Sequence, residues 1–281
     1  MMNKNGIDIS VYQGDIDFKK LKDNVDFVMI RIGYGKGKYD SKAVKNIEGC
    51  KTNNIPFGGY WFSYALTPEM ATAEADYICD MMDNYTPTYP ICFDYEGDSY
   101  NNAVKNNCKP DKQMLQAIAT AFCSRVEERG YYAMIYTNID FWNRGFGALS
   151  SKYDIWLAQW KVSKPSKNCG IWQKSSAGNV SGIDGKVDLD IAYKDYPVII
   201  NNMNKKKKQN TKEEKKKKEE AKNVELNNFK EETWNSYLSL AKDVIAGKWG
   251  NGQARKRALN NSGFDYSVAQ KIVDIIMKYG N

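Results

Sequence analysis

Short apolar runs alternate with segments of helical periodicity along the first half of the chain. The apolar runs predict strands at residues 6–10, 26–33, 56–64, 89–96 and 131–137. Apolar residues recur at helical spacing in the intervening residues 17–23, 41–53, 68–84 and 111–129, and again near 139–143. Such alternation favours parallel strands covered by helices.

Three more strands are predicted after the last of these helices, at residues 154–160, 169–173 and 185–190. Eight strands indicate that the sheet closes on itself, with its last three strands joined by loops. The predicted fold class is therefore an α/β barrel. In such barrels the functional groups project from the C-terminal ends of the strands.

A charged segment separates this region from the rest of the chain. Residues 205–222, KKKKQNTKEEKKKKEEAK, contain no apolar residue except Ala221 and cannot join a core. Glu213 and Glu214 stand four residues before Lys217 and Lys218, a spacing that supports a semi-rigid helix. A solvated connector is the simpler interpretation.

Residues 230–279 predict three short helices. Two apolar faces are expected, one formed by Trp234, Leu238, Ala241 and Ile245 and the other by Val268, Ile272 and Ile275. The predicted domains are a barrel large enough to be a catalytic domain at residues 1–200, a Lys/Glu-rich linker at 201–228 and a three-helix module at 229–281.

The charge is distributed unevenly along the chain. Residues 1–200 hold 23 Lys and Arg against 24 Asp and Glu, whereas the net charge of the whole chain is +7. The positive charge therefore belongs to the linker and the module. A nearly neutral barrel argues against nucleic-acid binding, and the basic segment favours an anionic surface as partner.

The chain contains no histidine. This excludes Ser-His-Asp and Cys-His nucleophile pairs and His-ligated zinc sites, so acid–base chemistry falls to Asp, Glu, Tyr, Lys or Cys. The six cysteines show no CxxC pair and no metal-ligand spacing, and we expect buried thiols at Cys50, Cys79, Cys92, Cys108, Cys123 and Cys169. No metal or cofactor is expected.

No apolar run approaches the length of a membrane span. The first residues, MMNKNGIDIS, lack the apolar core of a secretion signal. We therefore expect a protein that is made in the cytoplasm and does not insert into a membrane.

Acidic residues follow several of the predicted strands. Asp94 and Glu96 in ICFDYEGD are separated by one residue, so on a strand both side chains leave the same face. Asp8 ends the first predicted strand, and Asp188 and Asp190 lie in the last, which closure places beside the first. Carboxylates gathered in this way raise one another's pKa, as a proton donor working near neutral pH requires.

Two other interpretations apply to these acids. A single Asp at a strand end is commonly a turn or helix-cap residue, and this is the more frequent role for Asp8 or Asp188 taken alone. A cation site made of oxygens is the second, although no Gly-spaced acidic loop accompanies it. An Asp-x-Glu sequence directly after a buried run favours catalysis over both.

Aromatic residues fall at or near the same strand ends. They are Tyr34, Tyr60, Trp61, Phe62, Tyr64, Tyr95, Tyr136, Trp156, Trp160 and Trp172. Strand aromatics are commonly core residues, and we expect about half of these to be so, the rest offering surfaces on which sugar rings stack. Carboxylates with aromatics, in a chain without histidine, point to glycoside hydrolysis.

Seven motifs occur in one order along the chain: GIDISVYQG, FVMIRIGYG, YWFSYA, FDYEGD, IYTN, IWLAQW and IWQKSSAGNVSGIDGKVDLD. Together they resemble the lysozymes of glycoside hydrolase family 25, the muramidases common among phage endolysins. The resemblance runs from Asn5 to Tyr196. It implies an irregular TIM-like barrel in which five β/α units are followed by three strands.

The resemblance also implies a role for each acid. Glu96 matches the proton donor, and Asp94 matches the acid that stabilises developing positive charge or orients the substrate acetamido group. Asp8 and Asp188 match two supporting carboxylates. Substrate-binding residues are expected at Tyr34, Tyr60, Tyr64, Tyr136, Trp160, Gln173 and Asp190. Asp190 stands where many relatives carry Asn, which leaves its role open, and Trp61 stands where some carry His.

The implied reaction is hydrolysis of the β-1,4 bond between N-acetylmuramic acid and N-acetylglucosamine in bacterial peptidoglycan. Retaining, inverting and substrate-assisted routes all stay open, because residues i and i+2 on a strand lie about 6.6 Å apart and rotamers span the carboxyl separations of each. The alternatives are a wall-binding protein with a silent barrel, which the intact acids disfavour, and a chitinase-like glycosidase, which the short DYE motif disfavours.

The end of the chain carries a second resemblance. LAKDVIAGKWGNGQARKRALNNSGFDYSVAQKIVDIIMK resembles a single repeat of the helical cell-wall-binding modules of some phage lysozymes. It implies muropeptide recognition, with contacts expected from Trp249, Asn251, Arg255 and Asp265. A core position for Trp249 and a helix N-cap role for Asp265 are equally good interpretations. One module gains little avidity, so self-association through this region would strengthen binding.

Two expectations concern how the protein is produced and released. An endolysin of this kind is made in the bacterial host and reaches the wall through a holin-type membrane lesion. Met203, between barrel and linker, is a candidate internal start. Its product would be a free binding module that associates with the full-length enzyme.

Overall fold

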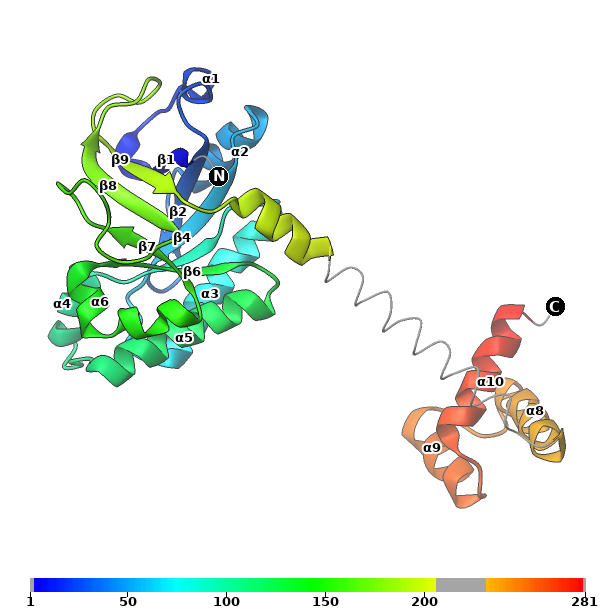
Figure 1. The fold of residues 1–281 in the computed structure, drawn as a ribbon. Helices are drawn as coiled ribbons and strands as arrows, with labels where there is room; N and C mark the ends of the chain where they lie inside the picture. Colours follow the sequence, from blue (N-terminus) through cyan, green and yellow to red (C-terminus); the bar gives the residue numbers. More distant parts are fainter. Residues whose placement is uncertain (1–2, 206–230, 280–281) are drawn as a thin grey trace. The chain divides into compact units, whose positions relative to one another are not determined.

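The computed structural model describes residues 3–205 and 231–279 (Figure 1). The chain divides into two compact units, Met1–Lys206 and Lys207–Asn281, which are treated separately. The predicted linker at 201–228 lies outside the described residues except for residues 201–205, which are helical. The predicted helix-spaced pairs at Glu213 and Glu214 also lie outside them.

Eight strands of the first unit form a closed barrel. They are β1 (Lys4–Ile9), β2 (Phe27–Tyr34), β4 (Phe57–Phe62), β5 (Ile91–Asp94), β6 (Ala133–Asn138), β7 (Asp154–Ala158), β8 (Ile171–Gly178) and β9 (Val187–Ala192). Neighbours are parallel from β1 through β2 to β8, and β9 closes the ring antiparallel to both β8 and β1. The predicted barrel is confirmed, with one strand reversed. β3 (Lys38–Tyr39) forms a hairpin on β2.

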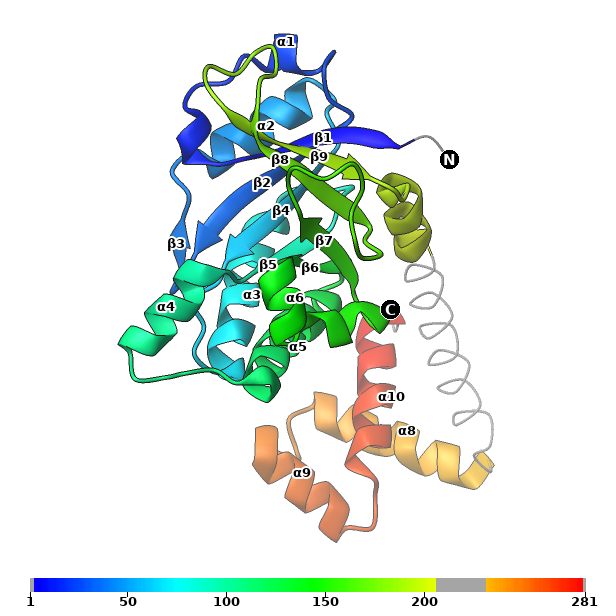
Figure 2. The same ribbon diagram turned by 60° about the vertical axis from the view of Figure 1, so that its left-hand side comes forward.

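Helices cover the outside of the barrel. Those in predicted regions are α1 (Phe18–Leu21), α2 (Ala43–Thr52), α3 (Pro68–Met82), α5 (Lys112–Glu128) and α6 (Ile139–Arg144). Those not predicted are α4 (Gly97–Lys105), the 3-10 turns η1 (Val11–Gln13) and η2 (Phe146–Ser151), and a helical segment at residues 196–205. Figures 1 and 2 show α3 and α5 side by side along the barrel wall.

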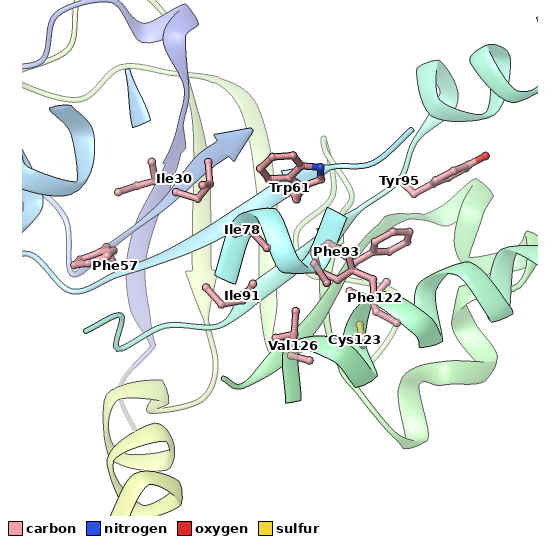
Figure 3. Close-up of a cluster of buried hydrophobic side chains, with 14 of the residues drawn as sticks. Ile30, Phe57, Trp61, Ile78, Ile91, Phe93, Tyr95, Phe122, Cys123 and Val126 are labelled. Atoms are coloured by element: carbon pink, nitrogen blue, oxygen red, sulfur yellow. The ribbon is translucent and has the colours of Figure 1, made fainter. Parts of the chain in front are cut away.

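The two faces of each strand pack against different layers, because successive side chains point to opposite sides. On β5, Ile91 and Phe93 face the helices and Cys92 faces the barrel interior. Figure 3 shows the helix-side cluster, where the β5 side chains lie near Phe122 and Val126 of α5. This alternation also decides which residues reach the interior.

Apolar side chains fill one end of the interior. The Phe27 ring stacks on Tyr89 with 4.3 Å between centroids, and Gly6 is required opposite because a Cβ there would overlap the Phe27 ring. Tyr196 and Ile200, from the helical segment after β9, are buried in the same cluster. The polar side chains that line the largest group of adjoining pockets lie at the other end, where the parallel strands terminate.

The second unit contains α8 (Glu231–Ile245), α9 (Gly252–Asn261) and α10 (Tyr266–Tyr279), as predicted. Its core is formed by Tyr237, Leu240, Ala241, Val244, Leu259, Ala269, Ile272 and Val273. The predicted faces were partly wrong, since Ile245 and Ile275 are 42% and 41% exposed. Tyr237 takes the buried position instead, because its hydroxyl accepts a hydrogen bond from the Asp265 backbone N–H at 2.8 Å. No helix in the described ranges has the length and apolarity needed to cross a membrane.

Candidate active site

The polar end of the barrel gathers the last inward-facing residue of successive strands. Arg31 follows Phe27 and Met29 at two-residue intervals on β2, and Asp94 follows Cys92 on β5. Tyr136 and Gln173 hold the equivalent places on β6 and β8. They line one pocket of about 190 Å³ together with Asp8, Ser10, Tyr12, Gln13, Tyr60, Phe62, Glu96, Trp156 and Asp188.

Asp94 and Glu96 enter this pocket from one short stretch of backbone. Asp94 ends β5, whereas Glu96 lies beyond the strand as the N-cap of α4. The Glu96 backbone is still extended, with φ −131° and ψ −165°. The Tyr95 side chain between them is fully buried and belongs to the helix-side cluster, in which Figure 3 labels it. The predicted convergence therefore occurs, although the strand ends two residues earlier than expected.

The two carboxyl groups have different electrostatic surroundings. Burial, and then the charge of Glu96, raise the pKa of Asp94 well above its usual range, while the Arg31 guanidinium acts in the opposite direction. Burial also raises the pKa of Glu96, and Tyr136 opposes this by hydrogen bonding. Both carboxyl groups therefore hold a proton more readily than they would in water, with Arg31 opposing the rise at Asp94 and Tyr136 opposing it at Glu96.

The supporting acids lie across the β1–β9 pairing, where Asp8 stands opposite Asp188. Gln173 links this pair to the rest of the pocket: Nε2 donates to Asp8 Oδ2 at 2.8 Å. Gln173 Oε1 accepts from the Tyr136 hydroxyl at 3.2 Å and from Trp160 Nε1 at 3.1 Å. Burial, with the neighbouring Asp190 and Asp188 charges, raises the pKa of Asp8 well above its usual range.

Asp190 lies beneath the pocket and does not line it. The side chain is 1% exposed, and Oδ1 accepts a hydrogen bond from Trp156 Nε1 at 2.8 Å. Burial raises the pKa of Asp190 to about 8. At neutral pH the group is therefore mostly a neutral acid, which has the shape of an asparagine.

Two further pockets adjoin the central one. One, of about 420 Å³, is lined by Val11, Tyr12, Arg31, Tyr34, Tyr39, Asp40, Ser41, Phe62, Tyr64 and Asp98. The other, of about 360 Å³, is lined by Glu96, Tyr136, Asn138, Ile139, Asp140, Ala158 and Trp160. Each shares residues with the central pocket, so the three form a groove across the barrel mouth with Glu96 between its ends.

Comparison with known proteins decides the family. Residues 7–183 match the glycosyl hydrolases family 25 profile, and residues 239–277 match the CW_7 repeat. The chain belongs to glycosyl hydrolase family 25.

Similar proteins carry names of the same kind. The autolytic lysozyme of Clostridium acetobutylicum is 27% identical over 191 residues, covering 66% of this chain and 54% of that protein. The lysozyme of Streptococcus phage Cp-7 is 26% identical over 235 residues, covering 79% and 56%. This chain thus spans about half the length of each. The autolysin LytC from Streptococcus pneumoniae, solved with a synthetic peptidoglycan ligand, matches with TM-score 0.62 and 27% identity, over 68% of this chain and 47% of LytC.

The family 25 groove contains most of the side chains expected to bind substrate. Tyr60, Tyr136 and Gln173 line the central pocket, Tyr34 and Tyr64 line one flanking pocket, and Trp160 lines the other. Sequence reasoning missed Arg31, Tyr12, Gln13 and Asp98, and it named Phe62 only among the strand-end aromatics. Arg31 carried a usable signal, since it is the lone charge inside the apolar run FVMIRIG and shares the spacing of Phe27 and Met29.

The CW_7 unit uses its predicted contact residues partly for its own structure. Trp249 packs half-buried against the module core. Asn251 Oδ1 accepts from Arg255 Nη2 at 2.8 Å, and Arg255 Nε donates to the Gly250 carbonyl at 2.9 Å. Asp265 caps α10, accepting from the Ser267 and Val268 backbone N–H groups at 2.7 and 3.2 Å. Contact of these four side chains with a ligand stays a prediction.

The described residues of the chain contain no candidate metal-binding site. No group of three or more Asp, Glu or Cys side chains there is arranged to hold an ion. All six cysteines are free, and five are buried as expected. Cys108 is only half-buried.

Proposed function

We propose that this family 25 protein is a muramidase, which hydrolyses the β-1,4 bond between N-acetylmuramic acid and N-acetylglucosamine in peptidoglycan. The observation that carries the proposal is the position of Glu96, whose pKa is raised by burial, beside a buried Asp94 and between the ends of the groove. A proton donor in the middle of a groove suits an enzyme that cuts within a polymer. The lysozyme names of the relatives support the same assignment.

Glu96 gives its proton to the glycosidic oxygen as the bond from that oxygen to C1 of muramic acid breaks. The N-acetylglucosamine part leaves as an alcohol, and positive charge develops at C1. Asp94, whose anion the Arg31 charge favours, stabilises the charge at C1 or orients the acetamido group that does so. Water then supplies a hydroxyl to C1 and the proton that restores Glu96.

Tyr136 and Gln173 position these groups. The Tyr136 hydroxyl, on β6, contacts both Glu96 and Gln173 and so restricts the orientation of the Glu96 carboxyl group. Gln173 in turn orients Asp8, whose pKa is raised by the same burial and acid neighbours. The carboxyl groups gathered in the pocket favour a cationic transition state over the neutral sugar.

Mass spectrometry of the fragments released from purified cell walls tests this function. A muramidase produces new reducing ends on muramic acid, and the Glu96→Gln variant should release none. New reducing ends on N-acetylglucosamine would contradict the proposal. Binding to walls without any release would identify a wall-binding protein, and cleavage of chitin oligomers alone would identify a chitinase-like enzyme.

We further propose that the protein is a phage-type endolysin whose CW_7 repeat holds it on the wall after release through a holin-type lesion. The single repeat matched at residues 239–277 supports an avidity gain from self-association. Sedimentation equilibrium of the full chain should show concentration-dependent association, and a strictly monomeric protein would count against it.

Internal initiation at Met203 is a separate proposal. Expression of the full gene should give a second, small product that reacts with antibodies to the module. Met203→Leu should remove this product. A single full-length band in both cases would contradict the proposal.

A further inference from the structure

Arg31 is the only cation among the described residues that line the groove. Among the described residues that line the three pockets, seven are acids, namely Asp8, Asp40, Asp94, Glu96, Asp98, Asp140 and Asp188, and one is basic. A cleft of this charge repels anionic ligands. A glycan that carries an acidic group therefore needs a counter-charge within the groove, and Arg31 is placed where two of the pockets meet.

Asp40 fixes the orientation of Arg31. Asp40 Oδ2 lies 2.8 Å from both Nε and Nη2 of the guanidinium. The same carboxylate, fully buried, also accepts from the Val11 backbone N–H at 3.0 Å and the Lys42 backbone N–H at 2.9 Å. The ion pair therefore holds one edge of the guanidinium rigidly against the protein.

The opposite end of the guanidinium remains available. No hydrogen bond engages Nη1 within the described part of the chain, and the Arg31 side chain keeps 13% of its surface exposed. The Tyr12 and Tyr34 rings lie 4.9 and 5.7 Å from Cζ, and both residues also line the flanking pocket of about 420 Å³. Nη1 and the second N–H of Nη2 thus form a fork that matches a carboxylate.

A purely structural role explains this arrangement poorly. Asp40 already has two backbone donors, and the barrel interior on β2 is apolar at Phe27 and Met29. Burying an ion pair in that position costs desolvation energy that an apolar side chain would not. Unlike an apolar side chain, Arg31 presents two N–H donors to the groove, and a ligand contact would account for that cost.

We propose that Arg31 binds a carboxylate on the side arm of a muramyl residue and makes the enzyme prefer acid-bearing glycan to neutral glycan. This inference rests on the proposed muramidase function. The carboxylate has two sources: the lactyl group of glycan stripped of peptide, or an acidic residue of an attached peptide. The tyrosines of the adjoining pocket would pack against the same side arm.

The experiment compares glycan strands that differ only in charge. Strands freed of peptide carry lactyl carboxylates, and coupling these to methylamine makes them neutral. The wild-type kcat/KM should be about tenfold higher on the acidic strands, as one charged hydrogen-bonded contact provides. In Arg31→Gln this ratio should fall to about one, and Arg31→Lys, which keeps the charge but loses the fork, should give an intermediate ratio.

Matched controls separate charge from other effects. Lys105→Gln removes an exposed cation that lines none of the three pockets and should keep the wild-type ratio. High salt should lower the wild-type ratio because screening weakens charge pairing. Peptide-bearing strands form the third arm: a loss in Arg31→Gln confined to them assigns the contact to the peptide carboxylate, and a loss on stripped strands assigns it to the lactyl group.

The outcomes that overturn the inference are distinct. An unchanged ratio in Arg31→Gln, or equal losses on acidic and neutral strands, would show that Arg31 acts only through Asp94. Equal wild-type rates on both stripped strands, together with no loss in Arg31→Gln on peptide-bearing strands, would exclude the carboxylate site and leave the muramidase intact. Hydrolysis of neither strand would refute the muramidase function itself.

Discussion

Buried polar side chains distinguish the barrel from the C-terminal module. In the barrel, Asp8, Asp94, Asp190 and Gln173 are almost fully buried at the mouth. In the described part of the module, no polar side chain is buried to that extent, and Asp265 and Asn251 lie at exposed helix ends. The module satisfies its polar groups locally, whereas the barrel holds several against a cost in stability.

That difference separates residues explained by folding from residues that need another explanation. An N-cap at Asp265 stabilises α10 whether or not a ligand binds. A carboxyl with a raised pKa, such as that of Asp94, instead lowers the stability of the folded state at neutral pH. The acids at the barrel mouth are thus retained against stability, which is typical of catalytic groups.

Glu96→Gln gives the largest expected effect. Loss of the proton donor should lower wall clearing on the order of 10³-fold, without loss of the fold. The wild-type activity should also fall as pH rises through the raised pKa of Glu96, because only the protonated form donates. Turbidity of purified walls measured across pH, with thermal unfolding of both proteins, checks this. Clearing by Glu96→Gln would refute the role of Glu96.

Leu259→Ala tests the module alone. Leu259 is 1% exposed in the module core, so its truncation should cost about 2–5 kcal/mol and unfold so small a unit. The variant should no longer co-sediment with purified cell walls, whereas it should still hydrolyse soluble glycan fragments. Ile275→Ala, at a 41% exposed position, is the matched control and should retain binding. Equal effects of the two changes would contradict the core described above.

Glu74→Gln tests the cost of buried acids outside the groove. Glu74 accepts from the Ser63 hydroxyl at 2.5 Å and the Tyr64 backbone N–H at 3.0 Å, and burial raises its pKa to about 7. A raised folded-state pKa gives stability that is present below pH 4.5 and lost as pH rises through 7.

The free energy of unfolding of Glu74→Gln should therefore exceed that of wild type at pH 8 by about 2–3 kcal/mol, and match it more closely at pH 5. Urea unfolding at the two pH values measures this. A wild-type protein that gained stability between pH 5 and pH 8 relative to the variant would oppose the interpretation.

Asp265→Ala gives the smallest expected effect, about 1 kcal/mol of module stability through loss of the α10 cap. Asp265→Ser keeps a capping oxygen and should restore most of that stability. Wall binding by Asp265→Ser then separates the two roles of this residue. Retained binding indicates a cap only, and weak binding by the stable variant would indicate a ligand contact.

Sequence pattern located the strands and their acids because burial imposes alternation on every strand. Ile91 and Phe93 had to face the helices, so Asp94 had to face inward. The reversal of β9 was not predictable, because its loop-connected residues carry no signal of direction. α4 escaped prediction because Ser99 and Ala103, its two buried residues, show no apolar stripe.

In the module the choice of face failed for a related reason. Two stripes with helical spacing overlap on α8, one through Ile245 and one through Val244, and apolar content alone does not choose between them. The choice depends on the Tyr237 hydroxyl, which meets a backbone N–H 28 residues along the chain. Arg31 was likewise hidden, since its meaning depends on the position of Asp40 after folding.

The helical segment after β9 has a consequence for engineering chimeric lytic enzymes. Ile200 and Met203 from this segment line a small cavity with Tyr89 and Tyr132 beneath the barrel. A fusion partner joined immediately after the last strand would leave those aromatic rings open to water and to aggregation. A module exchanged onto this scaffold should therefore be joined no earlier than residue 206, so that the helical segment covering these aromatic rings stays with the barrel.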